Sequence, residues 1–193
     1  MYQVDAFASK VFSSNPAGVC PLKDSTMQNI AMENNLAETS FYIKDGEKYQ
    51  IRWFTPVAEV DLCGHATLAT AFVLFNLEGH VGDVIEFYSP RSGKLIVTKK
   101  DDLLTMNFPT DVFERVEMRK ELTDGFNIEP REAYKGKTDY MLVFDNESQI
   151  KNMIPDITSI SKLNARGVIV TAKGDSVDFV SRFFAPQVGV ETG

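Results

Sequence analysis

The sequence predicts an α+β protein made of two related halves, in which most strands are antiparallel. Three observations favour this class: many short β-rich runs alternate with turn sequences, one helical segment is apolar on all sides, and a five-residue pattern occurs twice. Short strands joined by tight turns form antiparallel sheets. With 193 residues, of which 44% are hydrophobic, the chain is large enough for one or two domains with a real core.

Short runs rich in β-forming residues occur along most of the sequence. They occupy residues 2–7, 17–22, 39–43, 49–54, 83–89, 94–99, 103–108, 140–144, 167–172 and 178–184. Charged and glycine-containing turn sequences such as "KDGEK", "SPRSGK", "KKDD" and "AKGDS" separate several of them.

Helical periodicity interrupts the strands at Ser25 to Leu36. Met27, Ile30, Ala31 and Asn34 recur at helical spacing there, and Ser25 with Gln28 has the spacing of a capping box. Weaker helical signals lie at residues 146–153 and 156–164.

The central helix, Gly64 to Asn76, is the most distinctive element. It contains strong helix formers and no polar stripe, which is typical of a buried helix, and it is too short to span a bilayer. Its first turn, at Gly64 and His65, must bring unpaired backbone N–H groups and the positive end of the helix dipole into the interior. A bound anion or carboxylate would satisfy them.

The repeated pattern is "RWFTP", Arg52 to Pro56, which recurs as "RFFAP", Arg182 to Pro186, with the same order of predicted elements upstream. It predicts a first domain at residues 1–108 and a second at 109–193. After the second copy the sequence reaches residue 193 without another central helix. We therefore expect an incomplete second domain in a C-terminally truncated chain, or a second half that evolved without this helix.

Composition excludes several classes of function. A net charge of −7 argues against nucleic acid or an anionic membrane as partner. Cys20 and Cys63 lie far apart without CxxC spacing, which predicts neither a disulfide framework nor a metal site. The first residues, "MYQVDAF", lack the features of a signal peptide, so we expect a cytoplasmic protein.

Several motifs together resemble one known family. The segments "SSNPAGVC", "ENNLAETSF", "RWFTPVAEVDLCGHATLATA", "RSGKL" and "RFFAP" are similar in sequence and order to the PhzF-like isomerases of phenazine biosynthesis. The resemblance implies a fold similar to diaminopimelate epimerase, with two pseudo-symmetric domains. Each would be a mostly antiparallel β-barrel around a central helix, with the active site in the cleft between them. It also implies an isomerase without a cofactor, often a homodimer.

Glu38, in "NLAET", is the candidate acid/base. From the residues alone, a carboxylate between apolar neighbours could be desolvated, with a raised pKa, or could be an ordinary solvated loop group. The resemblance places the family's catalytic glutamate at this position. His65 is either a helix-capping group or, by the resemblance, a catalytic residue that helps to position the substrate or relay the proton.

The expected substrate-binding residues are Asn15, Cys63 and Gly64. Gly64 would allow close backbone approach to an anion. Asn15 is either a turn residue or a ligand contact, and the family has Gly where Ser14 stands here.

Cys63 also supports an alternative, a two-thiol epimerase, because a helix N-terminus would lower its pKa. The second half offers Thr192 or Gly193 at the matching place and no carboxylate at residues 165–168 to match Glu38. The sequence thus favours a one-base proton shift and a packing role for Cys63.

The resulting expectation is an isomerase that shifts a proton in a small anionic, carboxylate-bearing substrate. A non-catalytic small-molecule-binding relative is the other alternative. Because the facing wall of the site would follow residue 193, we expect the 193-residue chain to have little activity.

Overall fold

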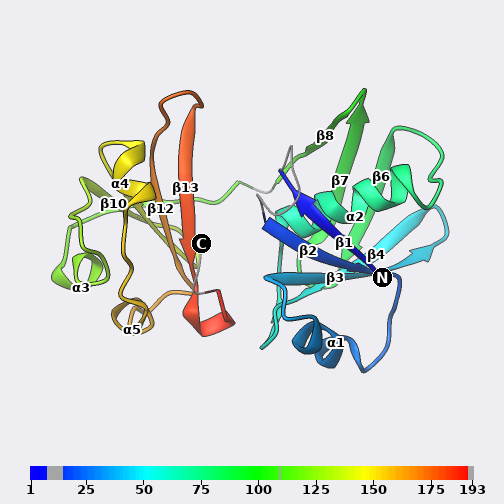
Figure 1. The fold of residues 1–193 in the computed structure, drawn as a ribbon, viewed down its shortest axis with the longest axis horizontal. Coiled ribbons are helices and arrows are strands. Elements are labelled where there is room, and N and C mark those ends of the chain that lie inside the picture. Colours follow the sequence, from blue (N-terminus) through cyan, green and yellow to red (C-terminus); the bar gives the residue numbers. More distant parts are fainter. Residues whose placement is uncertain (8–14, 109, 191–193) are drawn as a thin grey trace. The chain divides into compact units, whose positions relative to one another are not determined.

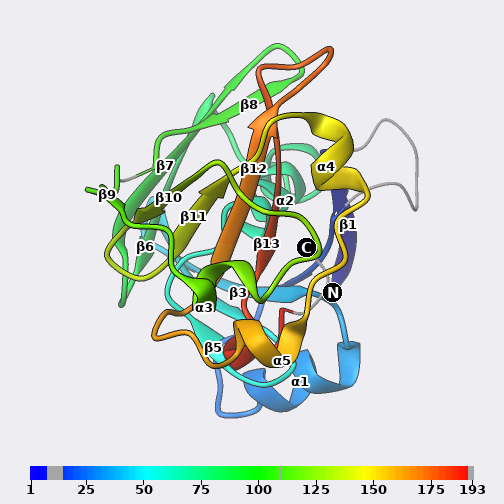
Figure 2. The same cartoon turned by 90° about the vertical axis from the view of Figure 1, so that its left-hand side faces the viewer.

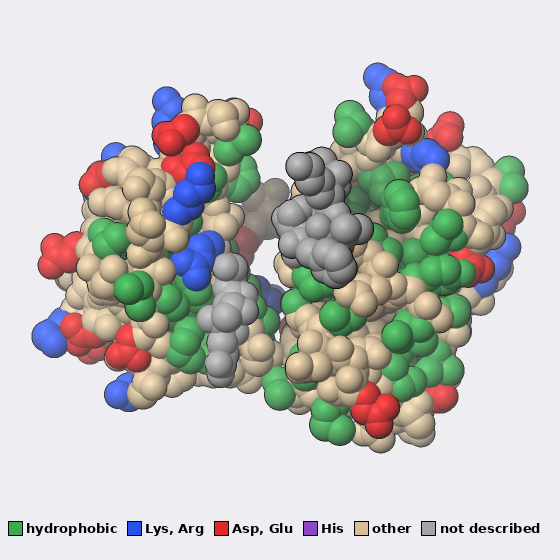
Figure 3. All heavy atoms as spheres, viewed as in Figure 1, with side chains coloured by type: hydrophobic (Ala, Val, Ile, Leu, Met, Phe, Trp, Pro, Cys, Tyr) green, Lys and Arg blue, Asp and Glu red, His purple; other side chains and the backbone are tan. Residues whose placement is uncertain are grey.

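The computed structural model describes residues 1–7, 15–108 and 110–190. The chain forms two compact units, Met1–Pro109 and Thr110–Gly193 (Figure 1). Among the described residues, no helix is both long and apolar enough to cross a membrane. Figure 3 shows acidic and basic side chains interspersed on the visible face of each unit.

Unit 1 is an eight-stranded sheet with two helices. Its strands are β1 (Tyr2–Ala6), β2 (Asn15–Cys20), β3 (Glu38–Asp45), β4 (Lys48–Phe54), β5 (Glu59–Val60), β6 (Val84–Ser89), β7 (Gly93–Lys100) and β8 (Leu103–Met106). The order is β1-β2-β3-β4-β6-β7-β8, with β5 paired to β4. The β2–β3 and β4–β6 pairs are parallel, so the sheet is mixed. The prediction that tight turns make the sheets mostly antiparallel missed these two crossovers.

Helix α2 (Gly64–Asn76) lies inside the curve of this sheet, which forms an open half-barrel around it (Figure 1). Its alanines and Val73 pack with Trp53 and Ile51 of β4 in one apolar core, because small side chains let a helix approach a sheet closely. The helix is not covered on every side: Phe72 is 45% exposed. It faces a groove of about 820 Å³ between β1 and the segment around β8.

Helix α1 (Met27–Asn34) covers the other face of β3, where Met27 and Ala31 pack against Phe41 and Phe54. The predicted capping box is wrong, because the helix begins one residue after Thr26 and has no side-chain cap. The Gln28 amide instead donates to the backbone oxygens of Thr55 and Pro56.

Unit 2 is a five-stranded sheet with short helices on one face (Figures 1 and 2). Its elements are β9 (Glu114–Val116), α3 (Lys120–Thr123), β10 (Glu132–Lys135), β11 (Tyr140–Val143), α4 (Glu147–Lys151), α5 (Ile157–Ile160), β12 (Val168–Lys173), β13 (Phe179–Phe184) and the 3-10 turn Pro186–Val188. The sequence patterns missed β5, β9, β10 and α3, all of four residues or fewer. Within the described part of unit 2, the longest helix is α4, with five residues.

The two copies of the repeated pattern occupy similar places in their sheets. The successive strand pairs within β1-β2-β3-β4 are antiparallel, parallel and antiparallel. The successive pairs within β10-β11-β12-β13 have the same three directions in the same order. Arg52 lies over the ring of Phe54 at 5.1 Å, and Arg182 lies over Phe184 at 4.9 Å.

Candidate active site

The predicted site residues of unit 1 come together where β3 begins and α2 begins. Helix α1 is closed by its C-cap residue Asn35, whose left-handed backbone (φ +48°) turns the chain so that β3 starts at Glu38. The parallel pairing of β2 with β3 sets Glu38 opposite Ala17, two residues from Asn15. Cys63 is the N-cap residue of α2, and His65 follows in its first turn. Three segments distant in sequence, β2, β3 and the start of α2, thereby supply one cluster.

Glu38 and His65 form the centre of this cluster. Their side chains are only 14% and 10% exposed, and Glu38 Oε2 lies 3.3 Å from His65 Nε2. The two groups are close but not aligned for a hydrogen bond, because Nε2 is buried without a partner in hydrogen-bonding geometry. Loose contacts of this kind are common in unliganded catalytic sites.

Burial shifts both pKa values toward the neutral forms. It raises the pKa of Glu38 from 4.5 to about 7 and lowers the pKa of His65 from 6.5 to about 4. The pair is therefore not a salt bridge at neutral pH. Between about pH 4 and 7 both groups are neutral, and above that range only Glu38 is charged.

The other ring nitrogen of His65 fixes its tautomer. Asn15 Nδ2 lies 3.4 Å from Nδ1, and Cys63 Sγ lies 3.5 Å from the same atom. An amide nitrogen and a thiol can both donate, so Nδ1 is the acceptor and Nε2 carries the proton. His65 thus carries its proton on the ring nitrogen that lies nearer to Glu38.

Cys63 is a buried thiol, and its pKa is raised well above the ordinary value. Desolvation is the main cause and the nearby Glu38 charge adds to it, while hydrogen bonds from the backbone of Ala66 and His65 act in the opposite direction. The expectation that the helix N-terminus lowers this pKa is therefore wrong, because burial outweighs the helix.

Gly64 lacks a side chain because another residue of unit 1 occupies that space. A Cβ at Gly64 would lie 2.5 Å from Cζ of Phe108, so the Phe108 ring reaches the first turn of α2. Sequence reasoning missed Phe108, since nothing around residue 108 marks a functional position. The expected role of Gly64 in anion binding stays a prediction.

A metal site is the other chemistry that this cluster suggests. Within the described ranges, Glu38, Cys63 and His65 offer one ligand atom each, and these atoms lie within 4.8 Å of one another. The closest contacts of Glu38 and Cys63 are with opposite ring nitrogens of His65. Binding of one metal ion needs all the donor atoms to face the same point. The arrangement therefore suits proton transfer better than metal binding.

Some predicted positions cannot be placed. Ser14, Thr192 and Gly193 lie outside the described residues, so the structure says nothing about the turn before Asn15 or the second-half counterpart of Cys63.

Comparison with known proteins identifies the family. The family model for phenazine biosynthesis-like proteins, PhzC-PhzF, matches residues 4–192. The chain belongs to this family. An uncharacterized isomerase of Pseudomonas aeruginosa is 47% identical over 195 residues, which cover 98% of this chain and 74% of that protein. The human phenazine biosynthesis-like domain-containing protein is 33% identical over 221 residues, covering 98% and 76% of the two chains.

Solved structures agree with this assignment. The PhzF-family protein of Enterococcus faecalis has a TM-score of 0.90 at 46% identity and covers 99% of this chain and 75% of its own. A predicted epimerase of Pseudomonas aeruginosa has a TM-score of 0.61 at 19% identity over 88% of this chain and 68% of its own, which shows a shared fold only. These coverages do not support the predicted C-terminal truncation, which stays a prediction.

Proposed function

We propose that this PhzC/PhzF-family protein is an isomerase that moves a proton within a small carboxylate-bearing substrate, with Glu38 as the acid and base. The observation that carries the proposal is the buried Glu38 carboxyl, with its pKa raised to about 7, at 3.3 Å from a neutral His65. Relatives named as isomerases support the reaction class.

Glu38 suits a reaction that needs both proton removal and proton return. A group whose pKa lies near the working pH is present in both forms, which makes one residue effective in each direction. An ordinary exposed glutamate would be almost fully ionised at pH 7 and would return a proton poorly. The proposed cycle therefore begins with the Glu38 carboxylate taking a proton from a substrate carbon and ends with the same group delivering it to another atom of that substrate.

His65 serves this cycle as a neutral hydrogen-bond donor. Its protonated Nε2 lies 3.3 Å from Glu38 and, once the two groups align in the liganded site, can hold the carboxylate form in place or bind a substrate oxygen that gains negative charge. The N–H groups at the start of α2 are the candidate partners for a substrate carboxylate, because a helix N-terminus favours anions.

The buried, neutral side chains of this site fit the two alternatives, a two-thiol epimerase and a non-catalytic binding protein, less well. A two-thiol epimerase needs a reactive Cys63, whose raised pKa makes it a poor nucleophile and base at neutral pH. A binding protein without activity would have no need for a carboxyl whose pKa lies near 7. We propose further that the reaction needs no cofactor and that the substrate is anionic. The homodimer expected from the family is measurable by light scattering.

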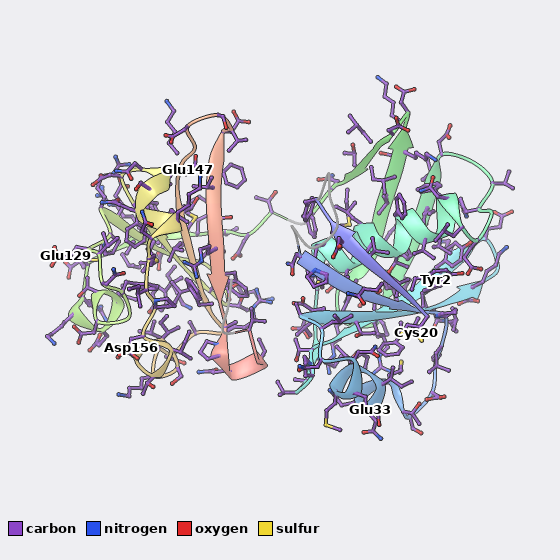
Figure 4. The ribbon with its side chains drawn as sticks, in the orientation of Figure 1. Tyr2, Cys20, Glu33, Glu129, Glu147 and Asp156 are labelled. Carbon is purple, nitrogen blue, oxygen red and sulfur yellow. The ribbon has the colours of Figure 1, made fainter. Side chains whose placement is uncertain are left out.

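The test is hydrogen exchange with solvent. The full chain would be incubated in D2O with a panel of small amino- and hydroxycarboxylic acids, and deuterium at carbon would be followed by NMR. Because little activity is expected of the 193-residue chain, we expect slow exchange of at least one probe over long incubation, and Glu38→Gln to lower that rate at least about a hundredfold with binding retained. Glu33→Gln, on exposed α1, is the matched control and should exchange at the wild-type rate (Figure 4). Unchanged exchange in Glu38→Gln would remove Glu38 as the base, and binding of a probe without exchange would favour the non-catalytic relative.

We also infer that the two units descend from one repeated arrangement, as the matching strand pairings and Arg–Phe contacts support. Superposing β1–β4 on β10–β13 tests this inference. If Arg52 and Arg182 do not overlay when the strands do, the sequence repeat is a coincidence.

A further inference from the structure

A pair of hydroxyl groups links β3 to α2 inside the core of unit 1. Ser40 Oγ lies 2.7 Å from Thr70 Oγ1, and both residues are 0% exposed. Apolar residues that include Trp53, Ala66 and Ala69 form the surrounding core. A buried polar pair in such a place is unusual, because apolar side chains of similar volume would fill it without the cost of desolvating hydroxyls.

Each hydroxyl is also tied to the backbone of another turn or strand. Ser40 Oγ lies 3.0 Å from the carbonyl oxygen of Gly18 on β2, and Thr70 Oγ1 lies 2.8 Å from that of Ala66 on α2. Two hydroxyl hydrogens satisfy two of these three contacts at a time. When Thr70 donates to Ser40, Ser40 donates onward to the Gly18 carbonyl, and when Ser40 donates to Thr70, Thr70 donates onward to the Ala66 carbonyl. The chain of contacts joins β2, β3 and α2.

These three elements carry the three polar members of the candidate active site. Glu38 and Ser40 lie two residues apart on β3 and so point to the same face, about 7 Å apart along the strand. His65 and Thr70 lie five residues apart on α2, about 7.5 Å along the helix axis. The axial steps are similar, and the Ser40–Thr70 and Glu38–His65 contacts both join β3 to α2.

We propose that Ser40 and Thr70 are positioning residues that fix the register of α2 on β3 and thereby hold His65 Nε2 beside Glu38. This inference rests on the proposed function of Glu38 and His65. A hydrophobic contact can slide along a helix, whereas a hydroxyl pair with a 2.7 Å separation holds one register. Without the bridge, the first turn of α2 is free to shift and to admit water between Glu38 and His65.

The experiment measures the imidazole of His65 in the unliganded full chain. The chain has two histidines, so His65→Asn assigns the NMR signals. Thr70→Val removes the bridging hydroxyl at nearly constant volume, Thr70→Ser restores it, and Ser40→Ala breaks the same bridge from the strand. Thr67→Val is the matched control, because the Thr67 hydroxyl is equally buried on α2 and, among the described residues, bonds to the Cys63 carbonyl of the same helix rather than to β3.

In Thr70→Val and Ser40→Ala we expect the His65 pKa to rise from about 4 toward its ordinary value of 6.5, since desolvation is what lowers it. Thr70→Ser and Thr67→Val should keep the wild-type pKa. If Thr70→Val titrates like Thr67→Val, the bridge does not position His65. Should Thr70→Val fail to fold, Ser40→Ala decides the matter alone.

This readout needs no substrate. A failure of Glu38→Gln to affect deuterium exchange would refute the proposed function without altering the titration result, so the two failures are distinguishable. If exchange on a probe is found, Thr70→Val should slow it about tenfold to a hundredfold and Thr70→Ser should rescue it, since small displacements of a catalytic group are costly.

Discussion

The opposite pKa shifts of Glu38 and His65 predict an unusual dependence of stability on pH. Glu38 is protonated more easily in the folded chain than in the unfolded chain. Its contribution to the free energy of unfolding is therefore present below pH 4.5 and is lost as the pH rises toward 7. His65 is protonated less easily when folded, so its contribution is present above pH 6.5 and is lost as the pH falls toward 4. Between pH 4.5 and 6.5 the two effects oppose each other.

The magnitudes follow from the shifts. The pKa of Glu38 moves from 4.5 to about 7 and that of His65 from 6.5 to about 4, and each change corresponds to roughly 3.5 kcal/mol at about 1.4 kcal/mol for each pH unit. In the wild-type chain the two slopes nearly cancel across the window. Glu38→Gln leaves only the His65 slope, so the free energy of unfolding of unit 1 should rise by about 2 to 3 kcal/mol from pH 4.5 to 6.5, relative to wild type. His65→Gln should produce the reverse trend.

Trp53 makes the measurement specific to unit 1. It is the single tryptophan of the chain and is completely buried in that core, so its fluorescence in urea reports the unfolding of this unit. Glu33→Gln is the control for loss of a charge and should run parallel to wild type. Parallel curves for wild type, Glu38→Gln and His65→Gln would refute the assignment of perturbed pKa values to this pair.

Two further predictions concern neighbouring residues. Cys20 on β2 is half-buried (Figure 4), whereas Cys63 is buried and its pKa is strongly raised. Iodoacetamide at pH 8 should therefore modify Cys20 at least about tenfold faster than Cys63, measured by mass spectrometry of peptides. Equal rates would contradict the burial of Cys63. Gly64→Ala should change the free energy of unfolding by less than about 1 kcal/mol, because the obstructing atoms are the far end of the Phe108 ring, which is 41% exposed and can move aside. In a Phe108→Ala background, where the ring is gone, the same change should stabilise the chain by up to about 1 kcal/mol, and a loss of more than about 1 kcal/mol in either background would contradict this account.

The local elements of unit 1 were accessible to sequence reasoning because their patterns are local. Alternation indicated most strands longer than four residues, and the uniformly apolar segment indicated α2. The pairing of β2 with β3 was not accessible, because a parallel neighbour is joined through α1 rather than through a turn. The same reasoning placed a cap at Ser25, where the tertiary contact of Gln28 with Thr55 took precedence over the local motif.

The candidate site shows a similar division. The family resemblance directed attention to Glu38 and His65, but their separation and their shifted pKa values depend on burial by elements distant in sequence. Phe108 and the Ser40–Thr70 bridge carry no sequence signal, since a phenylalanine after a strand and a threonine in a helix are ordinary. Only the fold brings Phe108 against the first turn of α2 and Ser40 of β3 against Thr70 of the same helix.

One physical cause, removal from water, acts on Glu38, His65 and Cys63 and leaves all three uncharged between about pH 4 and 7. A neutral site beside the start of α2 presents no like charge to an incoming carboxylate, whereas ionised Glu38 repels it. Binding of a small anion should therefore weaken about tenfold between pH 6 and 8, the size expected for two partly screened charges. Titration with malonate, followed by the backbone amide signals of Gly64 and His65, measures this. Glu38→Gln should bind malonate equally at both pH values, and a pH dependence that survives in this variant would show that another group controls anion binding.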